Sequence, residues 1–118
     1  MITLHGIKNC DSVRKARRWL EQHDIDYGFR DFREQAPDIA ELNSWLERCE
    51  WEALLNKRST TWKTLGDDQR AEVSDRASAT RLMAAHPTLI KRPVLIDGNT
   101  LKLGFKAQDY SALFEQSA

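Results

Sequence analysis

Residues 2–20 read ITLHGIKNCDSVRKARRWL, and much of the fold follows from this segment. It opens with a short apolar run at 2–4, which predicts a β-strand, and a polar connection then leads to Cys10. Apolar residues follow at helical spacing, so an amphipathic helix is expected over about 11–23. The sequence therefore predicts a cysteine at the N-terminus of a helix that directly follows a strand.

The predicted position of Cys10 favours a reactive thiol. A helix N-terminus carries partial positive charge and free N–H donors, both of which stabilise a thiolate over a thiol. Many cysteines are instead buried and inert, but the order strand, loop, cysteine, helix favours the reactive interpretation. A carboxylate facing the sulfur would oppose the thiolate, so Asp11 is expected to cap the helix backbone. For Cys49, the sequence favours a core or half-buried residue over a resolving thiol.

Composition narrows the class of protein. The chain has 118 residues, enough for one domain with its own core, and 18 basic residues balance 18 acidic ones. This balance gives no basic field that would favour direct nucleic-acid binding. The sequence shows neither a signal-peptide pattern nor a long apolar run, and its two cysteines do not indicate a disulfide framework. We therefore expect a cytoplasmic protein without membrane contact, and the lack of metal-ligand spacing argues against a bound metal.

The middle of the chain predicts a strand and then helices. Residues 27–32 alternate after a glycine and predict a second strand, which gives a βαβ unit with parallel strands. Several helices are expected between about 36 and 88, and Asp38 is expected to cap the first of them. The buried stripe of that helix is predicted to contain Ile39, Leu42, Trp45 and Leu46.

The C-terminal third predicts two further strands and a helix. An apolar run at 89–96 and a returning strand at 100–103 flank the hairpin signal Asp97-Gly98-Asn99, and a final helix is expected over about 107–114. The element order predicts an α/β fold with a mixed four-stranded sheet and helices on both faces. Antiparallel pairing is expected only at the last hairpin.

This order, with a cysteine after the first strand and Pro93 opening the third, is the thioredoxin-like plan. The chain resembles the arsenate reductase (ArsC)/Spx family, most closely its small YffB-type members. Three segments carry the resemblance: GIKNCDSVRKA at 6–16, LLNKRSTTW at 54–62 and HPTLIKRPVLI at 86–96. It implies one thioredoxin-like domain over 1–118, with an all-helical insertion at about 36–88 between the second and third strands.

The resemblance also implies roles for individual residues. Cys10 matches the family's nucleophilic cysteine. Arg92 matches an arginine that faces this cysteine and binds an oxyanion, and Pro93 matches a cis-proline beside which glutathione binds together with Arg92. Arg58 lies close to the family's second arginine, and Lys8 and Asn9 are expected to assist anion binding.

Two departures from the family pattern shape the functional hypothesis. Glutaredoxin-linked arsenate reductases carry a third arginine after the last strand, where this chain offers only Lys106, and lysine lacks the bidentate geometry of arginine. Spx proteins often carry a second cysteine where this chain has Val13, so a local disulfide cannot form. The resemblance thus implies a monothiol reductase that uses glutathione as co-substrate, with glutaredoxin as a candidate partner.

Two alternatives remain open at this stage. One is an Spx-like regulator that docks on RNA polymerase, for which the basic residues of the first helix offer a candidate face: Arg14, Lys15, Arg17 and Arg18. The sequence favours a solvated helix face for those residues over a docking face, because acidic residues follow closely in the sequence. The other alternative is an arsenate reductase with a relaxed site.

Overall fold

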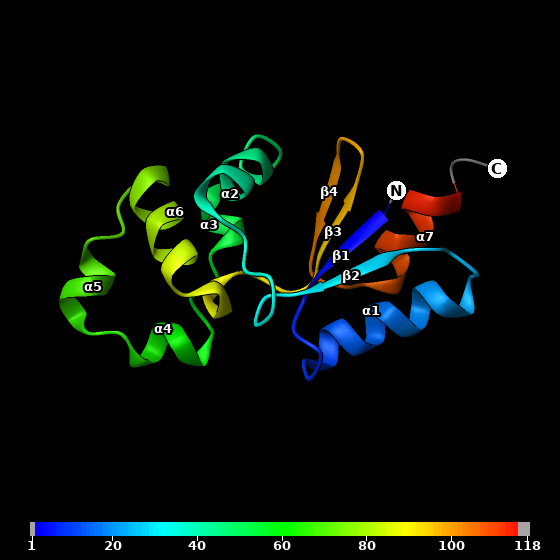
Figure 1. The fold of residues 1–118 in the computed structure, drawn as a ribbon, viewed down its shortest axis with the longest axis horizontal. Helices are drawn as coiled ribbons and strands as arrows, with labels where there is room; N and C mark the ends of the chain where they lie inside the picture. Colours follow the sequence, from blue (N-terminus) through cyan, green and yellow to red (C-terminus); the bar gives the residue numbers. More distant parts are fainter. Residues whose placement is uncertain (1, 116–118) are drawn as a thin grey trace. The chain divides into compact units, whose positions relative to one another are not determined.

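The computed structural model describes residues 2–115 and divides the chain into two compact units (Figure 1). The sheet unit comprises Met1–Asp31 and Arg92–Ala118, and the helical unit comprises Phe32–Lys91. The prediction of a single domain stays a prediction. Within the described residues, no helix has the length and apolar character needed to span a membrane.

Four strands form the sheet of the sheet unit. They are β1 (Ile2–Gly6), β2 (Gly28–Asp31), β3 (Val94–Asp97) and β4 (Thr100–Leu103), arranged in the order β2-β1-β3-β4. The helix α1 (Asp11–Gln22) connects β1 to β2, and these two strands are parallel, as the βαβ pattern predicts. The predicted boundaries of the first helix, the last hairpin and the last helix are confirmed to within a few residues.

The direction of β3 corrects one prediction. β3 is antiparallel to β1 as well as to β4, so antiparallel pairing is not confined to the last hairpin. A short crossover through one helix forces two strands to be parallel. The whole helical unit lies between β2 and β3 in the sequence, and so long a connection leaves the direction of β3 free.

One face of the sheet carries the core of the sheet unit. Leu4 and Leu95 are partners in the register of β1 and β3, so their side chains share a face. The helices α1 and α7 (Ala107–Glu115) cover this face, because Trp19 of α1 meets Tyr110 of α7 edge to face at 5.5 Å between ring centroids. The buried cluster consists of Leu4, Ala16, Trp19, Leu20, Leu95 and Tyr110. Helices on the second face stay a prediction.

The helical unit is built from short helices (Figure 1). These are α2 (Ile39–Trp45), α3 (Trp51–Leu54), α4 (Thr60–Thr64), α5 (Asp67–Ala71), α6 (Arg76–Ala85) and the 3₁₀ turn η1 (Pro87–Leu89). The predicted cap is confirmed, because the Asp38 carboxylate accepts the N–H of Glu41 at 2.8 Å. The prediction that Ile39 is buried is wrong: it lies in the first turn of α2 and is 48% exposed, whereas the buried stripe begins one turn later at Leu42.

A backbone pairing that sequence reasoning missed joins two distant segments of the helical unit. Leu55 and Ile90 form an isolated antiparallel bridge. On either side of it, the N–H of Asn56 donates to the carbonyl of Leu89 at 2.7 Å, and the N–H of Lys91 donates to the carbonyl of Leu54 at 2.8 Å. The first part of the apolar run predicted as a strand is therefore a 3₁₀ turn and a bridge, and β3 begins only at Val94.

Candidate functional site

Cys10 occupies the N-cap position of α1, as the sequence predicts. Its backbone is extended, with φ of −94° and ψ of 131°, and its carbonyl accepts the N–H of Arg14 at 2.9 Å as the first bond of the helix. Its own N–H donates to the carbonyl of Ile7 at 3.2 Å, which closes a tight turn. The thiol is free and half-buried. A cysteine so placed lies beside the free N–H donors at the positive end of the helix.

The approach of β1 to α1 determines where this turn can lie. A Cβ atom on Gly6, the last residue of β1, would stand 2.6 Å from a methyl group of Val13 in the first turn of α1. Val13 is fully buried, so its side chain has little room to move away. The absence of a side chain at position 6 thus permits the strand end and the helix start to meet closely, and Cys10 lies between these two fixed points.

Asp31, the last residue of β2, contacts the same turn. The register pairs it with Gly6, and its Oδ2 atom accepts the backbone N–H of Lys8 at 3.1 Å. The residue is only 6% exposed. Sequence reasoning missed it as a site residue, although a carboxylate at the end of a strand that runs into the core was a usable signal.

The Arg92–Pro93 segment, which precedes β3, lies at the same end of the sheet as the Cys10 turn. Val94 pairs with His5 of the antiparallel β1, so the start of β3 lies beside the end of β1. The Arg92–Pro93 peptide bond immediately before it is cis, as the family resemblance implies. The carbonyl of Pro93 accepts the N–H of Gly104 at 2.9 Å, which ties this segment to the end of β4. The Cys10 turn and the Arg92–Pro93 segment therefore meet at one end of the sheet.

The predicted site residues divide between the two units. Lys8 and Asn9, whose side chains are exposed, lie in the turn with Cys10, and Arg92 and Pro93 join them at the same end of the sheet. Arg58 belongs to the helical unit.

Arg58 lies in a loop that its own unit holds in place. Its side chain is exposed, and its backbone N–H donates to the Oδ1 atom of Asn56 at 3.1 Å. The bridge between Leu55 and Ile90 ties this loop to the segment that ends at Lys91, the residue before Arg92 in the chain. A role for Arg58 toward Cys10 stays a prediction.

Asp11 differs from its predicted role. Its carboxylate pairs with the guanidinium of Arg14 one helical turn later, and no side chain caps α1 at Cys10 in the described part of the chain. The arginine satisfies the carboxylate on the exposed surface of the helix, so Asp11 does not cap the backbone. Neighbouring opposite charges of this kind neutralise part of the field that Asp11 would exert on the sulfur.

Cys49 is half-buried, as the sequence predicts. Its thiol donates to the carbonyl of Trp45 at a sulfur–oxygen distance of 3.6 Å. Burial raises the pKa of the Cys49 thiol, the neighbouring charge of Glu50 raises it further, and Arg76 opposes this change. The environment of Cys49 therefore favours the unreactive thiol.

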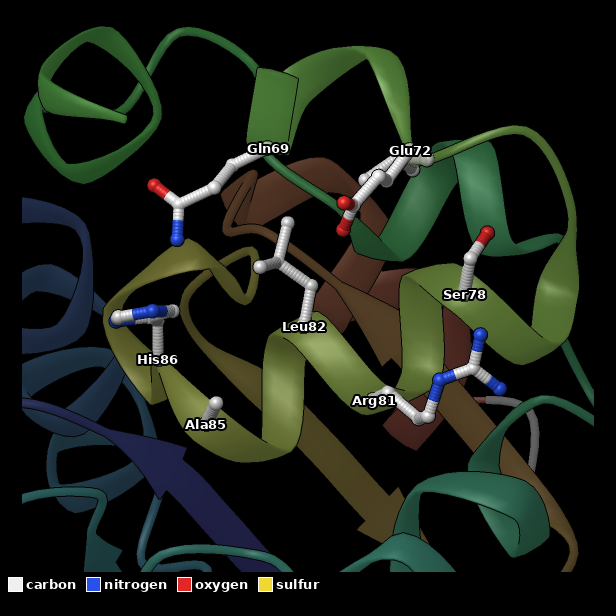
Figure 2. Close-up of a pocket in the computed structure, with 8 residues that line it drawn as sticks. Gln69, Glu72, Ser78, Arg81, Leu82, Ala85 and His86 are labelled. Carbon is white, nitrogen blue, oxygen red and sulfur yellow. The ribbon is translucent and has the colours of Figure 1, made fainter. Parts of the chain in front are cut away.

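A pocket of about 400 Å³ lies between α5 and α6 in the helical unit, and Figure 2 shows its lining. Two of its polar side chains serve helix ends: the Oε1 atom of Gln69 accepts the N–H of Gly66, and the Oγ atom of Ser78 accepts the N–H of Asp75. Leu82 contributes to an apolar floor. The lining contains no cysteine, and within residues 2–115 no group of three or more histidine, cysteine and carboxylate side chains could hold a metal ion. Cys10 therefore stays the candidate nucleophile, and the described residues that line the pocket offer no thiol or metal site as an alternative.

Comparisons with known proteins show the family and the fold to which the chain is similar. The model of the ArsC family matches residues 5–113. The solved structure of a YffB protein is 40% identical, covers 95% of this chain and 97% of its own, and superposes with a TM-score of 0.90. An arsenate reductase (ArsC) related protein from Brucella melitensis is 46% identical, covers 97% of this chain and 94% of its own, and has a TM-score of 0.75.

A curated relative extends the likeness to transcriptional regulators. The global transcriptional regulator Spx of Bacillus subtilis is 31% identical over 111 residues, which is 92% of this chain and 83% of the relative. Together the matches confirm the predicted resemblance and the thioredoxin-like fold.

Proposed function

Because the chain belongs to the ArsC family, we propose that it is a glutathione-dependent monothiol reductase in which Cys10 is the nucleophile. The observation that carries the proposal is the position of Cys10: a half-buried thiol at the N-cap of α1, at the end of the sheet where the cis Arg92–Pro93 bond lies. A helix N-terminus stabilises the thiolate, which is the nucleophile in thiol–disulfide exchange.

Two exchange steps complete the reaction. The Cys10 thiolate attacks a disulfide R–S–S–R′, a new bond forms between Cys10 and the R sulfur, and R′S⁻ leaves and takes up a proton. A glutathione thiolate then attacks the R sulfur, which releases the Cys10 thiolate and gives the mixed disulfide of R with glutathione. No second cysteine takes part, because Val13 stands at the position from which a Cys-x-x-Cys partner would act.

The other site residues act on charge and position. The guanidinium of Arg92 stabilises the Cys10 thiolate and binds a glutathione carboxylate or an oxyanion, a task suited to its planar, bidentate donors. Pro93 offers its backbone to the bound glutathione. Lys8 and Asn9 add a positive charge and a hydrogen-bond donor at the same end of the sheet, and Arg58 supplies a second guanidinium.

The test is the reactivity of Cys10 in a Cys49→Ser background. Alkylation rates are measured across pH 5 to 10, and the mass is determined after treatment with oxidised glutathione. We expect one glutathione adduct on Cys10. In Arg92→Ala we expect alkylation at pH 7 to fall about fivefold or more and the alkylation profile to move to higher pH.

A matched control is Arg18→Ala, which removes an exposed arginine of α1 and is expected to leave the profile unchanged. A Cys10 that takes no adduct, or a profile that is identical in wild type and Arg92→Ala, would contradict the proposed reductase.

A second candidate function is a transcriptional regulator that docks on RNA polymerase, and the identity with Spx favours it. The basic residues of α1 give it limited support. Arg14 pairs with Asp11, and Arg17 donates to the hydroxyl of Tyr27 at 3.0 Å and lies over the ring of Phe29 at 4.3 Å. Two of the four basic side chains thus have partners within the sheet unit.

Binding to purified RNA polymerase tests the regulator. Tight binding that is lost in Lys15→Glu/Arg18→Glu, in a chain whose Cys10 is unreactive, would favour docking over the reductase. Equal binding by wild type and the double variant would remove the basic face from consideration.

Arsenate is the other substrate that the family suggests, through the related protein from Brucella melitensis. Lys106, the cation after the last strand, is exposed, and its carbonyl accepts the N–H groups of Asp109 and Tyr110 at the start of α7. Its backbone thus supports the helix, while a single ammonium replaces a bidentate clamp. We expect arsenate reduction with glutathione to be slow, and a Lys106→Arg variant that accelerates it would show a relaxed arsenate site.

A further inference from the structure

Asp31 is a buried carboxylate that the proposed chemistry does not use. It ends β2, is 6% exposed, and belongs to the same unit as Cys10. Removing a carboxylate from water is costly unless hydrogen bonds compensate for the lost hydration. Hydrogen bonds to neighbouring groups therefore fix the position of a buried carboxylate, and the same bonds fix the positions of those groups.

One of those partners is the turn that carries Cys10. The Oδ2 atom of Asp31 accepts the backbone N–H of Lys8 at 3.1 Å, across 23 positions of sequence. Lys8 is an exposed residue, yet its backbone amide is bound by this buried carboxylate. The next bond in the turn runs from the N–H of Cys10 to the carbonyl of Ile7 at 3.2 Å. The contact with Asp31 thus lies between the end of β1 and the nucleophile.

We infer that Asp31 is a positioning residue for Cys10: its carboxylate oxygen fixes the Lys8 amide and thereby holds the thiol at the N-terminus of α1. This inference deepens the proposed function and rests on it. The proposed role does not depend on the negative charge of Asp31. What the turn requires is a hydrogen-bond acceptor at this point of β2.

The experiment separates the acceptor from the charge. Asp31→Asn keeps an acceptor oxygen and removes the charge, whereas Asp31→Ala removes both. In a Cys49→Ser background, the rate constant of alkylation by iodoacetamide is measured across pH 5 to 10. We expect Asp31→Asn to stay within about twofold of wild type at pH 7, and Asp31→Ala to fall about fivefold with its profile moved to higher pH.

Asp97→Ala is the matched control. Asp97 also ends a strand of the same sheet, but the register places it opposite Ile2, at the end of β1 far from Cys10. We expect this variant to lose stability toward urea without any change in the alkylation rate. Equal loss of reactivity in Asp97→Ala and Asp31→Ala would overturn the inference, since general loosening of the sheet would explain both.

Two results for the Asp31 variants themselves would also overturn the inference. An Asp31→Ala variant that alkylates at the wild-type rate overturns the inference, and so does an Asp31→Asn variant that falls as far as Asp31→Ala. Should Asp31→Ala not fold, Asp31→Leu gives the same comparison, because leucine has nearly the shape of asparagine and offers no acceptor atom.

Alkylation requires no glutathione, so the two failures can be told apart. A wild-type chain that forms no glutathione adduct contradicts the proposed function, whereas the difference between the Asn and Ala variants still reports on Asp31.

Discussion

The sheet unit and the helical unit are held together in different ways. In the sheet unit, residues from both ends of the chain meet across four strands, and α1 and α7 share one buried cluster. The helical unit contains helices of 4 to 10 residues, several of which are capped by the side chain that precedes them: Asp38, Ser59 and Asp75. Helices this short are marginal alone, so caps and packing must stabilise them.

This difference explains where the candidate chemistry lies. A nucleophile needs a backbone that is fixed from several directions, and non-local strand pairing supplies this at Cys10 through Gly6, Asp31 and Val94. In the helical unit, much of the hydrogen bonding is local to each helix end, and the cysteine it contains follows a helix instead of preceding one. The two cysteines give the most direct comparison of the units.

The largest expected effect is the difference in reactivity between these cysteines. A chain that retains only Cys10 (Cys49→Ser) is expected to alkylate at pH 7 at least about tenfold faster than one that retains only Cys49 (Cys10→Ser). Burial and Glu50 raise the pKa of the Cys49 thiol, so at a given pH less of it is thiolate than in an ordinary cysteine. Alkylation of Cys10→Ser should therefore accelerate only at alkaline pH.

The control for this prediction is the unfolded state. In concentrated urea both environments disappear, and the two single-cysteine variants should alkylate at the same rate. Equal rates in the folded chains would contradict the assignment of the nucleophile to the sheet unit.

The second prediction compares a glycine from each unit. Gly6→Ala places a Cβ atom 2.6 Å from a methyl group of buried Val13, and we expect it to lower the free energy of unfolding by about 1–3 kcal/mol. Gly66 has nothing within 4 Å of the same position and a φ of −68°, so Gly66→Ala should change it by less than about 0.5 kcal/mol. Urea denaturation measures both.

A Gly6→Ala variant as stable as wild type would mean that the junction of β1 and α1 can relax. In that case Cys10 would not be held by the close approach of the strand and the helix, and the contrast between the units would weaken.

The sequence predicted those features that depend on residues close together in the chain. The spacing of Val13, Ala16, Trp19 and Leu20 predicts the buried face of α1, and all four are buried. Asp97-Gly98 predicts the hairpin, and Gly98 has the positive φ of 59° that such turns use. Cys10 at the helix N-terminus belongs to the same class of local pattern.

Features that depend on distant residues escaped prediction. The antiparallel direction of β3 and the bridge between Leu55 and Ile90 are set by pairing across long stretches of chain, for which periodicity carries no information. Asp31 was missed for the same reason, since its importance comes from an amide 23 positions away. The exposure of Ile39 also escaped prediction. Helical spacing predicts which face of α2 is apolar, but it does not predict how far along the helix that face is covered by other residues.

The third prediction concerns the caps of the helical unit. The Ser59 hydroxyl accepts the N–H of Trp62 at 3.1 Å at the start of α4, and Ser59→Ala is expected to cost about 1 kcal/mol. The matched change in the sheet unit is Ser12→Ala, in the first turn of α1, where the serine is exposed and Cys10 is the N-cap. It should cost less than about 0.5 kcal/mol. Equal losses, measured by urea denaturation, would contradict the view that caps matter more in the helical unit.

The smallest expected effect is in the core of the sheet unit. Among the described residues, the buried hydroxyl of Tyr110 has no hydrogen-bond partner, and burial raises the pKa of this phenol. Replacing a buried, unsatisfied polar group with an apolar one of the same shape is nearly neutral or stabilising. We therefore expect Tyr110→Phe to raise the free energy of unfolding by less than about 1 kcal/mol at pH 7, measured with urea.

The same substitution should have a distinct dependence on pH. Since the folded state holds the phenol proton more tightly than the unfolded state, the contribution of Tyr110 is fully present below about pH 10 and is lost as the pH rises above it. Between about pH 9 and 11, the free energy of unfolding should therefore fall in wild type more than it falls in Tyr110→Phe. Tyr27→Phe is the control, because the Tyr27 hydroxyl accepts a hydrogen bond from Arg17, and its loss should destabilise the protein by about 1 kcal/mol. A Tyr110→Phe variant that is less stable than wild type would mean that the Tyr110 hydroxyl has a hydrogen-bond partner. The core of the sheet unit would then resemble the helical unit, in whose described residues few buried polar groups lack a partner.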